Sequence, residues 1–329
     1  MMQLLDAIAQ NNFLIIGRAG MDFYPDPPGT KTEDAAQFVS HLGGSSANIG
    51  VAICRHGGKA SVVTRVSDDA IGRFAVNQLR HYGIDATYVT PVGGEYRNSL
   101  AVVESRVEDH QSVIYRNGAA DFQMNDDDVM APDYASYGAV ITTGTVLAAE
   151  PSRSATFKAF DHARSLGLPL IFDLDYRPYS WPSAEEASEV YSRAADYCDM
   201  IIGNDDEFGF MAGDYDKGLE KARSLAKSTA SIVVYKMGHL GAITITPEEE
   251  FRTGIYAVET LKPTGAGDAF MGGLISSLAS GHDLKSSVLR GSACAAIVVA
   301  KVGCAPAMPT TSQLEDFLKS HPGPTQNQG

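Results

Sequence analysis

Short apolar runs rich in β-branched residues alternate with amphipathic segments along most of the chain, in the rhythm expected of βαβ units. Strands are predicted at Phe13–Ile16, Ser61–Thr64, Ala139–Thr142, Leu170–Asp173, Met200–Ile202, Ser231–Tyr235 and Ala242–Thr246. Helices are predicted between them, at Ser45–His56, Asp69–Tyr82, Ser152–Ser165, Ala184–Ala195, Leu219–Ala226, Ala266–Ser280 and Ser286–Lys301. This alternation predicts an α/β fold, in which helices cover both faces of a mostly parallel sheet.

Two segments break this rhythm. Residues 18–40 are rich in Pro and Gly with little helical periodicity, and residues 96–118 have the alternation of a β-hairpin. We expect the two to form a small sheet appended to a main domain of residues 12–17, 41–95 and 119–318. The tail, residues 319–329, is rich in Pro, Gly and Gln and is expected to fray.

The amino-acid composition of the chain argues against several classes of binding partner. The chain has 329 residues, of which 44% are hydrophobic, so it can bury a large core. Lys and Arg number 26 against 40 Asp and Glu, and the formal net charge of −14 argues against nucleic acid or an anionic membrane as a partner. The sequence has no secretory signal and no apolar stretch near the ~18 residues of a membrane span, so we expect a cytoplasmic protein. The four cysteines are scattered, which favours neither a disulfide framework nor a zinc site.

The most informative segment is residues 262–268, with the sequence KPTGAGD. A Gly-Ala-Gly turn that enters a helix leaves backbone N–H groups free to bind an anion, and the helix adds about half a positive charge there. Asp268, in the first turn, could accept a proton from a nearby hydroxyl. The alternative is an ordinary glycine turn in which Asp268 only favours the helix start. Residues 57–60, GGKA, lack the spacing and the Ser/Thr of a Walker A motif.

The segment KPTGAGD, residues 262–268, resembles as a whole the C-terminal signature of the ribokinase-like, or PfkB, carbohydrate kinases. Residues 43–48, GGSSAN, followed by a helix of small residues and by Gly72, resemble the N-terminal signature of the same family. The resemblance runs from about residue 13 to residue 318. It implies a three-layer α/β/α domain that binds the nucleotide, with the two segments that break the rhythm forming a β-sheet lid over the sugar. It also allows a homodimer that pairs through the lid.

The resemblance implies phosphoryl transfer from ATP to a primary hydroxyl group. Asp268 would accept the hydroxyl proton, and the backbone amides of Gly265, Ala266 and Gly267 would stabilise charge on the transferring phosphoryl group. Lys236, Gly238 and Gly241 lie in KMGHLG, which resembles the family's nucleotide-binding turn.

Asn204 and Glu207, in the sequence NDDE, resemble the family element that holds Mg²⁺ through water. The alternative for Glu207 is a solvated surface carboxylate. Lys262 stands where the family more often has an Asp, and K⁺ is therefore left unassigned.

The resemblance also implies which residues bind the acceptor sugar. They are Asp22, Gly43, Gly44 and Asn48. Asp22 follows the first strand and would receive sugar hydroxyl groups, while the two glycines would let the substrate approach the backbone. Asn48 can both donate to and accept from a hydroxyl group, although it could equally be a helix cap or a satisfied buried amide.

Two arginines indicate which class of sugar the substrate belongs to. Arg116 ends the predicted lid hairpin, and Arg177 follows a strand at its carboxyl end, two residues after Asp175, which we also place in the substrate site. A guanidinium group matches a carboxylate, which a neutral sugar lacks. The alternative for each arginine is a surface or structural ion pair.

Within the family, DLDYRPYSW, GRAGMDFYP and LGGSSANI most resemble the kinases that phosphorylate 5-dehydro-2-deoxy-D-gluconate to its 6-phosphate in inositol catabolism. The alternatives are a 2-keto-3-deoxygluconate kinase, a kinase of a neutral sugar such as fructose or ribose, and a sugar-binding module without catalysis. A nicotinamide-dependent dehydrogenase is disfavoured, because no GxGxxG follows the first strand.

Overall fold

The computed structural model describes residues 1–321, 323 and 324, and its centre is a nine-stranded sheet. The strand order is β13-β12-β11-β10-β9-β8-β1-β4-β5. The strands are β1 Asn12–Ile16, β4 Lys59–Ser67, β5 Val89–Val92, β8 Ala139–Thr143, β9 Leu170–Asp173, β10 Met200–Asn204, β11 Ile232–Lys236, β12 Ala242–Ile245 and β13 Glu250–Thr253. All neighbours from β11 to β5 are parallel, and only β12 and β13 pair antiparallel. The mostly parallel sheet is therefore confirmed.

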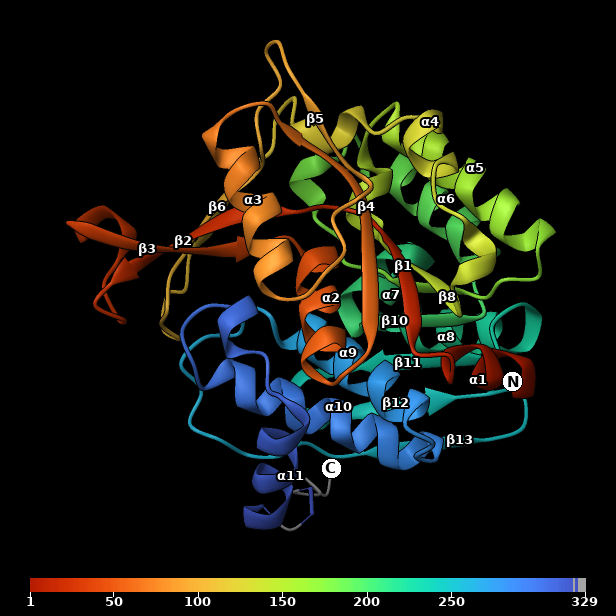
Figure 1. Ribbon diagram of the computed structural model, residues 1–329. Helices are drawn as coiled ribbons and strands as arrows, with labels where there is room; N and C mark the ends of the chain where they lie inside the picture. Colours follow the sequence, from red (N-terminus) through yellow and green to blue (C-terminus); the bar gives the residue numbers. More distant parts are fainter. Residues whose placement is uncertain (322, 325–329) are drawn as a thin grey trace.

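Helices cover both faces of this sheet (Figure 1). One face packs against α1 Met2–Ile8, α2 Ser45–Arg55, α3 Ala70–His81, α9 Ala266–Ala279, α10 Leu284–Val299 and α11 Thr311–Ser320. The other packs against α4 Asp126–Met130, α5 Ser152–Ser165, α6 Ala184–Ala195, α7 Asp205–Ala212 and α8 Gly218–Ser228. Successive residues of β1 belong to opposite cores, because side chains alternate across a strand. The result is the three-layer α/β/α arrangement expected from the sequence.

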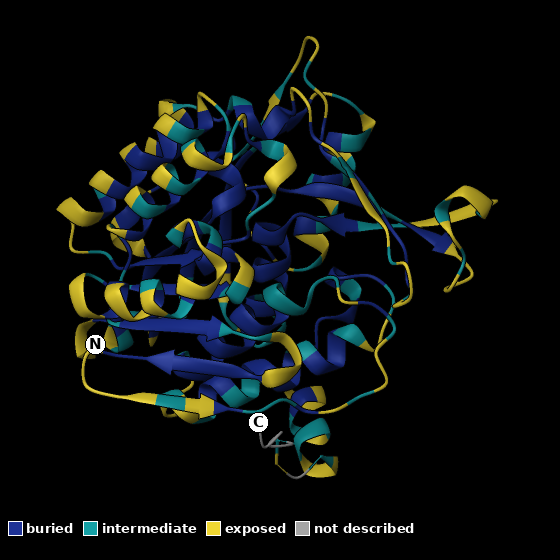
Figure 2. Ribbon diagram, turned by 180° about the vertical axis from the view of Figure 1, so that it is seen from behind, coloured by how far each residue is buried: buried dark blue, intermediate teal, exposed yellow. Residues whose placement is uncertain are grey.

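A second, four-stranded sheet has the order β3-β2-β6-β7, with β2 Gly20–Asp26, β3 Gln37–Gly43, β6 Leu100–Val103 and β7 Ser112–Tyr115. β2 pairs antiparallel with β3 and parallel with β6, and β6 pairs antiparallel with β7. β2 and β3 project from the body of the molecule, and the far end of this pair is exposed (Figures 1 and 2). The two segments that break the rhythm thus build one small sheet, and β3 continues three residues past the predicted boundary at residue 40. We call this sheet the lid.

The structure also contains elements that the sequence pattern did not predict. They are α1, α4, α7, α11, β5 and β13, all of them short or at an edge. α11 begins at a capping box between Thr310 and Gln313 and continues through Ser320. The prediction that the tail starts at residue 319 was therefore wrong for Lys319 and Ser320. Residues 322 and 325–329 of that predicted tail lie outside the described residues. In the described part of the chain, no helix has the length and apolar character to span a membrane.

Small residues let α9 lie close to its neighbouring helices. A Cβ placed on Gly272 of α9 would lie 2.3 Å from the Cβ of Ala52 in α2, and one on Gly273 would lie 2.7 Å from Sγ of Cys294 in α10. Helices α2 and α9 can touch at this point only because position 272 has no side chain. This contact also sets the distance between the first turns of α2 and α9.

The contact gives a test of the packing. We expect Gly272→Val to lower the free energy of unfolding by about 1–3 kcal/mol, because the added methyl groups overpack the contact with Ala52. Urea denaturation measures the change. Gly93→Ala is the control, since Gly93 is exposed with nothing within 4 Å of an added Cβ, and we expect it to stay within about 0.5 kcal/mol of the wild type. Equal midpoints for the two variants would contradict the close helix contact.

Candidate active site

The residues singled out from the sequence lie at the carboxyl ends of neighbouring parallel strands. Asp175 and Arg177 follow β9, Asn204 ends β10, and Lys236 ends β11. These three strands are adjacent in the sheet and run in the same direction. Their carboxyl ends therefore bring the four side chains to one edge, where open α/β sheets bind ligands.

The first turn of α9 faces the same edge. Gly265 caps the helix with φ of +85°, a backbone conformation that favours glycine, and Asp268 lies in the first turn. A Cβ placed on Gly267 would lie 3.4 Å from Nζ of Lys236, so the ammonium group lies against this turn. Unpaired backbone N–H groups, a helix N-terminus and an ammonium group thus meet, which is an arrangement suited to a phosphate.

A hydrogen bond joins Asp268 to α2. Nδ2 of Asn48 donates to Oδ2 of Asp268 at 2.9 Å. Burial raises the pKa of Asp268 to about 7, the negative charge of Asp175 adds to the rise, and the hydrogen bond from Asn48 and the positive charge of Arg177 oppose it. A carboxyl group with such a pKa can accept a proton near neutral pH.

The first turn of α2 makes several further contacts. Oγ of Ser45 donates to Oδ2 of Asp175 at 2.5 Å, and the backbone N–H of Ala47 donates to the carbonyl of Arg18 at 3.3 Å. With the bond from Asn48, this one turn binds groups that follow β1 and β9 and that begin α9. It fixes their relative positions.

Gly43 and Gly44 make room for the chain's own groups. A Cβ on Gly43 would lie 1.9 Å from Oδ1 of Asp22, and a Cβ on Gly44 would lie 2.4 Å from the carbonyl oxygen of Arg18. Gly44 also has φ of +96°. The interpretation from the sequence gave this space to the substrate. The structure instead requires both glycines for the packing of Asp22 and Arg18.

Asp22 is buried, with 5% of its surface exposed. The hydroxyl of Tyr24 donates to its Oδ2 at 3.5 Å. Burial raises the pKa of Asp22 to about 6, and the positive charge of Arg18 opposes the rise. The structure therefore places Asp22 on the lid strand β2 as a carboxyl group with a perturbed pKa.

Asn204 and Glu207 form a capping box at the start of α7. Oδ1 of Asn204 accepts from the backbone N–H of Glu207 at 2.8 Å, and Oε2 of Glu207 accepts from that of Asn204 at 2.7 Å. Oε1 of Glu207 accepts from the backbone N–H of Tyr176 at 3.1 Å. Glu207 is only 6% exposed, so it is not the solvated surface carboxylate considered as the alternative.

Buried carboxylates outnumber cations around Glu207. Burial raises the pKa of Glu207 and of Asp173, Asp175 raises both further, and the charge of Lys236 opposes the rise. Asp173, the last residue of β9, was not singled out from the sequence. Within residues 1–321, 323 and 324, no group of three or more His, Cys, Asp and Glu side chains could hold a metal directly. A carboxylate has about four acceptor positions, so Glu207 keeps some for water ligands, and this donor set fits Mg²⁺ held through water.

The turn after β11 contains Gly238 and Gly241, with φ of +55° and +85°. A Cβ on Gly241 would lie 2.0 Å from the carbonyl oxygen of Thr253, so the glycine allows β12 and β13 to approach. The turn begins one residue beyond Lys236, at the same edge of the sheet.

Both arginines predicted to bind the substrate have carboxylate partners within the chain. Arg116, 6% exposed, donates from Nε to Oδ2 of Asp121 at 3.1 Å and from Nη1 to the carbonyl of Thr145 at 2.9 Å. Arg177 pairs through Nη2 with Oδ1 of Asp175 at 2.6 Å, and 43% of its side chain remains exposed. Arg116 is therefore held inside the protein, whereas Arg177 keeps donors that a ligand can reach.

Two buried cations, Arg18 and Lys262, had no role assigned to them from the sequence, because the family signatures give them none. Arg18 is 7% exposed and follows β1, and its Nη1 donates to Oγ of Ser99 at 3.0 Å. Lys262 is fully buried and its Nζ donates to the carbonyl of Thr264 in the turn before α9. For Arg18 the signal was available, since a charged residue stands between the apolar run of β1 and the small residues that follow.

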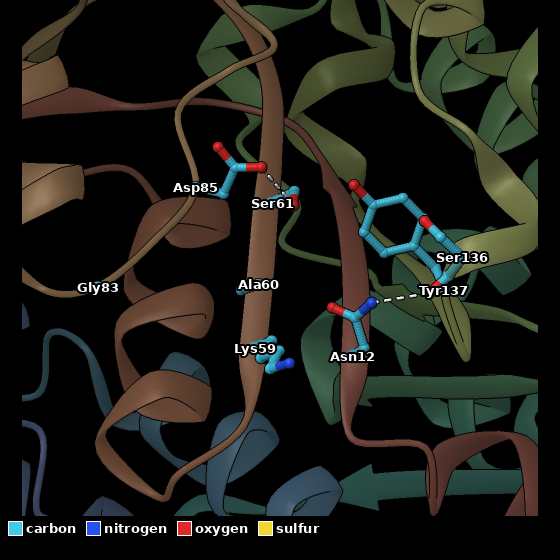
Figure 3. Close-up of a pocket in the computed structure, with 8 residues that line it drawn as sticks. All are labelled: Asn12, Lys59, Ala60, Ser61, Gly83, Asp85, Ser136 and Tyr137. Atoms are coloured by element: carbon cyan, nitrogen blue, oxygen red, sulfur yellow. Dashed lines mark hydrogen bonds between the residues drawn. The ribbon is translucent and has the colours of Figure 1, made fainter.

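A hollow of about 380 Å³ lies near the amino ends of β1 and β4 (Figure 3). Nδ2 of Asn12 donates to the carbonyl of Ser136 at 2.8 Å, and Oγ of Ser61 donates to Oδ2 of Asp85 at 3.1 Å. None of the residues singled out above lines it. It lies at the opposite end of these strands from the clustered side chains.

Comparison with known proteins agrees with this architecture. The model of the pfkB family of carbohydrate kinases matches residues 10–311. A 5-dehydro-2-deoxygluconokinase of Photobacterium profundum is 38% identical over 313 residues, covering 93% of this chain and 94% of its own. One of Geobacillus kaustophilus is 35% identical, and the match covers 94% of each chain.

Solved structures match over nearly the whole chain as well. Fructokinase from Vibrio cholerae O395, solved with fructose, ADP and calcium, has a TM-score of 0.82 and 26% identity over 94% of this chain and 99% of its own. Aminoimidazole riboside kinase from Salmonella enterica, solved with its riboside and an ATP analogue, has a TM-score of 0.78 and 25% identity over 93% and 99%. Motifs, fold and relatives agree, and the chain belongs to the pfkB family of carbohydrate kinases, which makes it a phosphotransferase that acts on an alcohol group of a sugar.

Proposed function

We propose that this kinase transfers the γ-phosphoryl group of ATP to the primary hydroxyl of 5-dehydro-2-deoxy-D-gluconate, giving the 6-phosphate. The observation that carries the proposal is Asp268, a carboxyl group with a pKa of about 7 in the first turn of α9, held by Asn48. The relatives named 5-dehydro-2-deoxygluconokinase, at 38% and 35% identity, support the choice of acceptor. Arg177, which keeps exposed donors beside Asp175, supports an acidic sugar over a neutral one.

In the proposed mechanism, Asp268 is the general base. Its carboxylate takes the proton of the acceptor hydroxyl while that oxygen bonds to the γ-phosphorus, and the bond from phosphorus to the bridging oxygen of ADP breaks. The electron pair of the broken bond leaves with ADP. Asn48 orients the carboxylate through its hydrogen bond to Oδ2, which leaves Oδ1 to face the acceptor.

The backbone N–H groups of Gly265, Ala266 and Gly267 would stabilise the charge on the transferring phosphoryl oxygens. Lys236, whose ammonium group lies against Gly267, would bind the phosphates of the nucleotide as a point charge. The turn of Gly238 and Gly241 would lie beside the nucleotide. Because phosphoryl transfer needs mainly positioning and charge stabilisation, these groups can supply what a P-loop does elsewhere.

Asn204 and Glu207 would hold Mg²⁺ through water, near the phosphates. When bound, the ion would neutralise charge on the nucleotide phosphates. Asn204 and Glu207 keep each other in place through the capping box, so that the carboxylate is positioned before the nucleotide arrives.

On the acceptor side we assign sugar contacts to Asp22, Asn48, Asp175 and Arg177. Asp175 is fixed by Ser45 and by Arg177, and Arg177 keeps exposed donors. We assign Arg116 a positioning role, because its guanidinium group is held by Asp121 and by the carbonyl of Thr145.

We also propose that two copies pair through their lids. Apolar side chains are exposed on the edge strands of the lid, with Phe38 and Val39 of β3 at 43% and 42%, and Val113 and Tyr115 of β7 at 45% and 64%. Exposed edge strands with apolar side chains are surfaces that proteins normally cover.

The base assignment predicts a pH dependence. Asp268 accepts a proton only as the carboxylate, so with a pKa of about 7 the kcat/KM for the sugar should fall about tenfold per pH unit below pH ~6 and level off above pH ~8. Asp268→Asn should lower kcat by about 10²–10⁴-fold. Steady-state kinetics across this pH range measures both. Asp127→Asn, which changes an exposed carboxylate at the start of α4, is the control with unchanged kcat.

The same raised pKa makes Asp268→Asn informative about stability. Because the pKa in the folded protein lies above its ordinary value of 3.8, the ionised carboxylate destabilises the folded state at pH 8 and not at pH 4. We expect Asp268→Asn to raise Tm at pH 8 and to leave Tm unchanged at pH 4. If the variant is inactive and also less stable than the wild type at pH 8, its loss of activity comes from misfolding and not from the loss of a base. That result would contradict the assignment.

The substrate assignment is tested by an acceptor panel. We expect kcat/KM for 5-dehydro-2-deoxygluconate to exceed that for 2-keto-3-deoxygluconate, fructose and ribose by at least tenfold, measured by coupled release of ADP. Phosphorylation of fructose without that of any sugar acid would overturn the acceptor and would favour a neutral-sugar kinase. Binding of a sugar acid without ADP release would favour a non-catalytic module.

The lid proposal is tested by the molar mass in solution. We expect light scattering after gel filtration to give a dimer, and Phe38→Glu to shift it to the monomer, because the charge lies on the exposed strand β3. Glu95→Lys, at an exposed position outside the lid strands, is the control that should stay dimeric. A wild-type monomer, or a dimer unaffected by the substitution, would contradict pairing through β3.

A further inference from the structure

Arg18 differs from the other arginines of the site in having no carboxylate partner. Its side chain is buried, with 7% of its surface exposed. Nη1 donates to Oγ of Ser99 at 3.0 Å, while Nε has no hydrogen-bond partner. No ion pair links it to any carboxylate in the part of the chain that the structure describes, whereas Arg116 pairs with Asp121 and Arg177 with Asp175. A buried cation without a paired anion is costly for a folded protein.

The guanidinium group lies among the charges of the acceptor side. The positive charge of Arg18 opposes the rise that burial causes in the pKa of Asp22, and with Arg177 it opposes the same rise in Tyr179. It also adds to the fall that burial causes in the pKa of Arg116. Arg18 therefore lies within electrostatic reach of Asp22, Arg116 and Tyr179.

The position of Arg18 is fixed from both parts of the molecule. Its carbonyl accepts from Ala47 of α2, an approach that the missing Cβ of Gly44 permits. Its guanidinium group is held by Ser99, just before lid strand β6. The side chain thus lies where β1 leaves the main sheet and the lid begins at Gly20. A rigid, preorganised cation at this junction can bind an anion at little entropic cost.

We propose that Arg18 binds the carboxylate of the acceptor and is the residue that makes the site specific for sugar acids over neutral sugars. The inference rests on the proposed function, because it takes the acceptor to be a sugar acid. The planar guanidinium fork would pair with the two carboxylate oxygens through Nε and an Nη, and Nε is the donor that lacks a partner. The acceptor's carboxylate would supply the anion that the protein itself does not.

Asp22 is the carboxylate of the protein itself that could pair with Arg18 in place of the acceptor. Its carboxyl group lies within electrostatic reach of Arg18, yet no hydrogen bond or ion pair joins the two, and Asp22 instead accepts from the hydroxyl of Tyr24. Burial raises the pKa of Asp22 to about 6, and the charge of Arg18 opposes this rise only in part. Asp22 therefore leaves Nε of Arg18 without a hydrogen-bond partner.

The test compares 5-dehydro-2-deoxygluconate with its methyl ester, which has the same hydroxyl groups but no charge. We expect the wild type to favour the acid over the ester by at least tenfold in kcat/KM. Arg18→Met should raise KM for the acid at least tenfold, abolish this preference and leave KM for ATP within twofold. Arg73→Met, on the exposed face of α3, is the matched control and should behave as the wild type.

A preference for the acid that survives Arg18→Met would overturn this inference alone. A wild type that phosphorylates neither this acid nor any other sugar acid would overturn the proposed function, and this inference with it. If Arg18→Met does not fold, Arg18→Lys replaces it, since the lysine keeps the charge but cannot form the planar fork. For that variant we expect KM for the acid to rise at least fivefold, and an unchanged KM would contradict the assignment.

Discussion

The first turn of α2 is the constraint on which the rest of the site depends. Three hydrogen bonds leave it within four residues: from Ser45 to Asp175, from Ala47 to the carbonyl of Arg18, and from Asn48 to Asp268. They connect the loops after β9 and β1 with the first turn of α9, which are far apart in the sequence. The turn can do this because Gly44 admits the Arg18 backbone and because Gly272 lets α9 approach α2. The same small residues therefore determine both how the helices pack and where the side chains of the site lie.

Charge is the second organising feature. The chain has a net charge of −14, and its site gathers the carboxylates of Asp173, Asp175, Glu207 and Asp268 near the ammonium group of Lys236 and the guanidinium group of Arg177. Burial raises the pKa of Asp268 and Glu207, and the negative charge of Asp175 adds to the rise. We propose that the positive field for an anionic nucleotide is local and comes from Lys236 and the N-terminus of α9. An acidic protein can thus bind anionic ligands without a basic surface.

Periodicity predicted the central strands and long helices, because each buries a regular apolar face. It missed α7, whose NDDE start reads as a turn although Asn204 and Glu207 form its capping box, and it missed edge strands such as β5, which are short and half-exposed. Motifs assigned Asp268, Lys236 and Glu207 to roles around the transferred phosphoryl group and the nucleotide, and the structure brings them to one edge of the sheet. The motifs could not show that Gly43 makes room for Asp22, or that Asp121 holds Arg116, because these contacts join residues through the fold.

We propose that burial and neighbouring carboxylates tune Asp268 to act as a base near neutral pH. The most direct measurement is a pH titration of the Asp268 side-chain carbon by NMR, in protein labelled at aspartate carboxyl groups and assigned by comparison with Asp268→Asn. We expect a pKa of about 7 in the free enzyme. A pKa near the ordinary value of 3.8 would contradict it, because such a carboxylate would be neither desolvated nor opposed by Asp175.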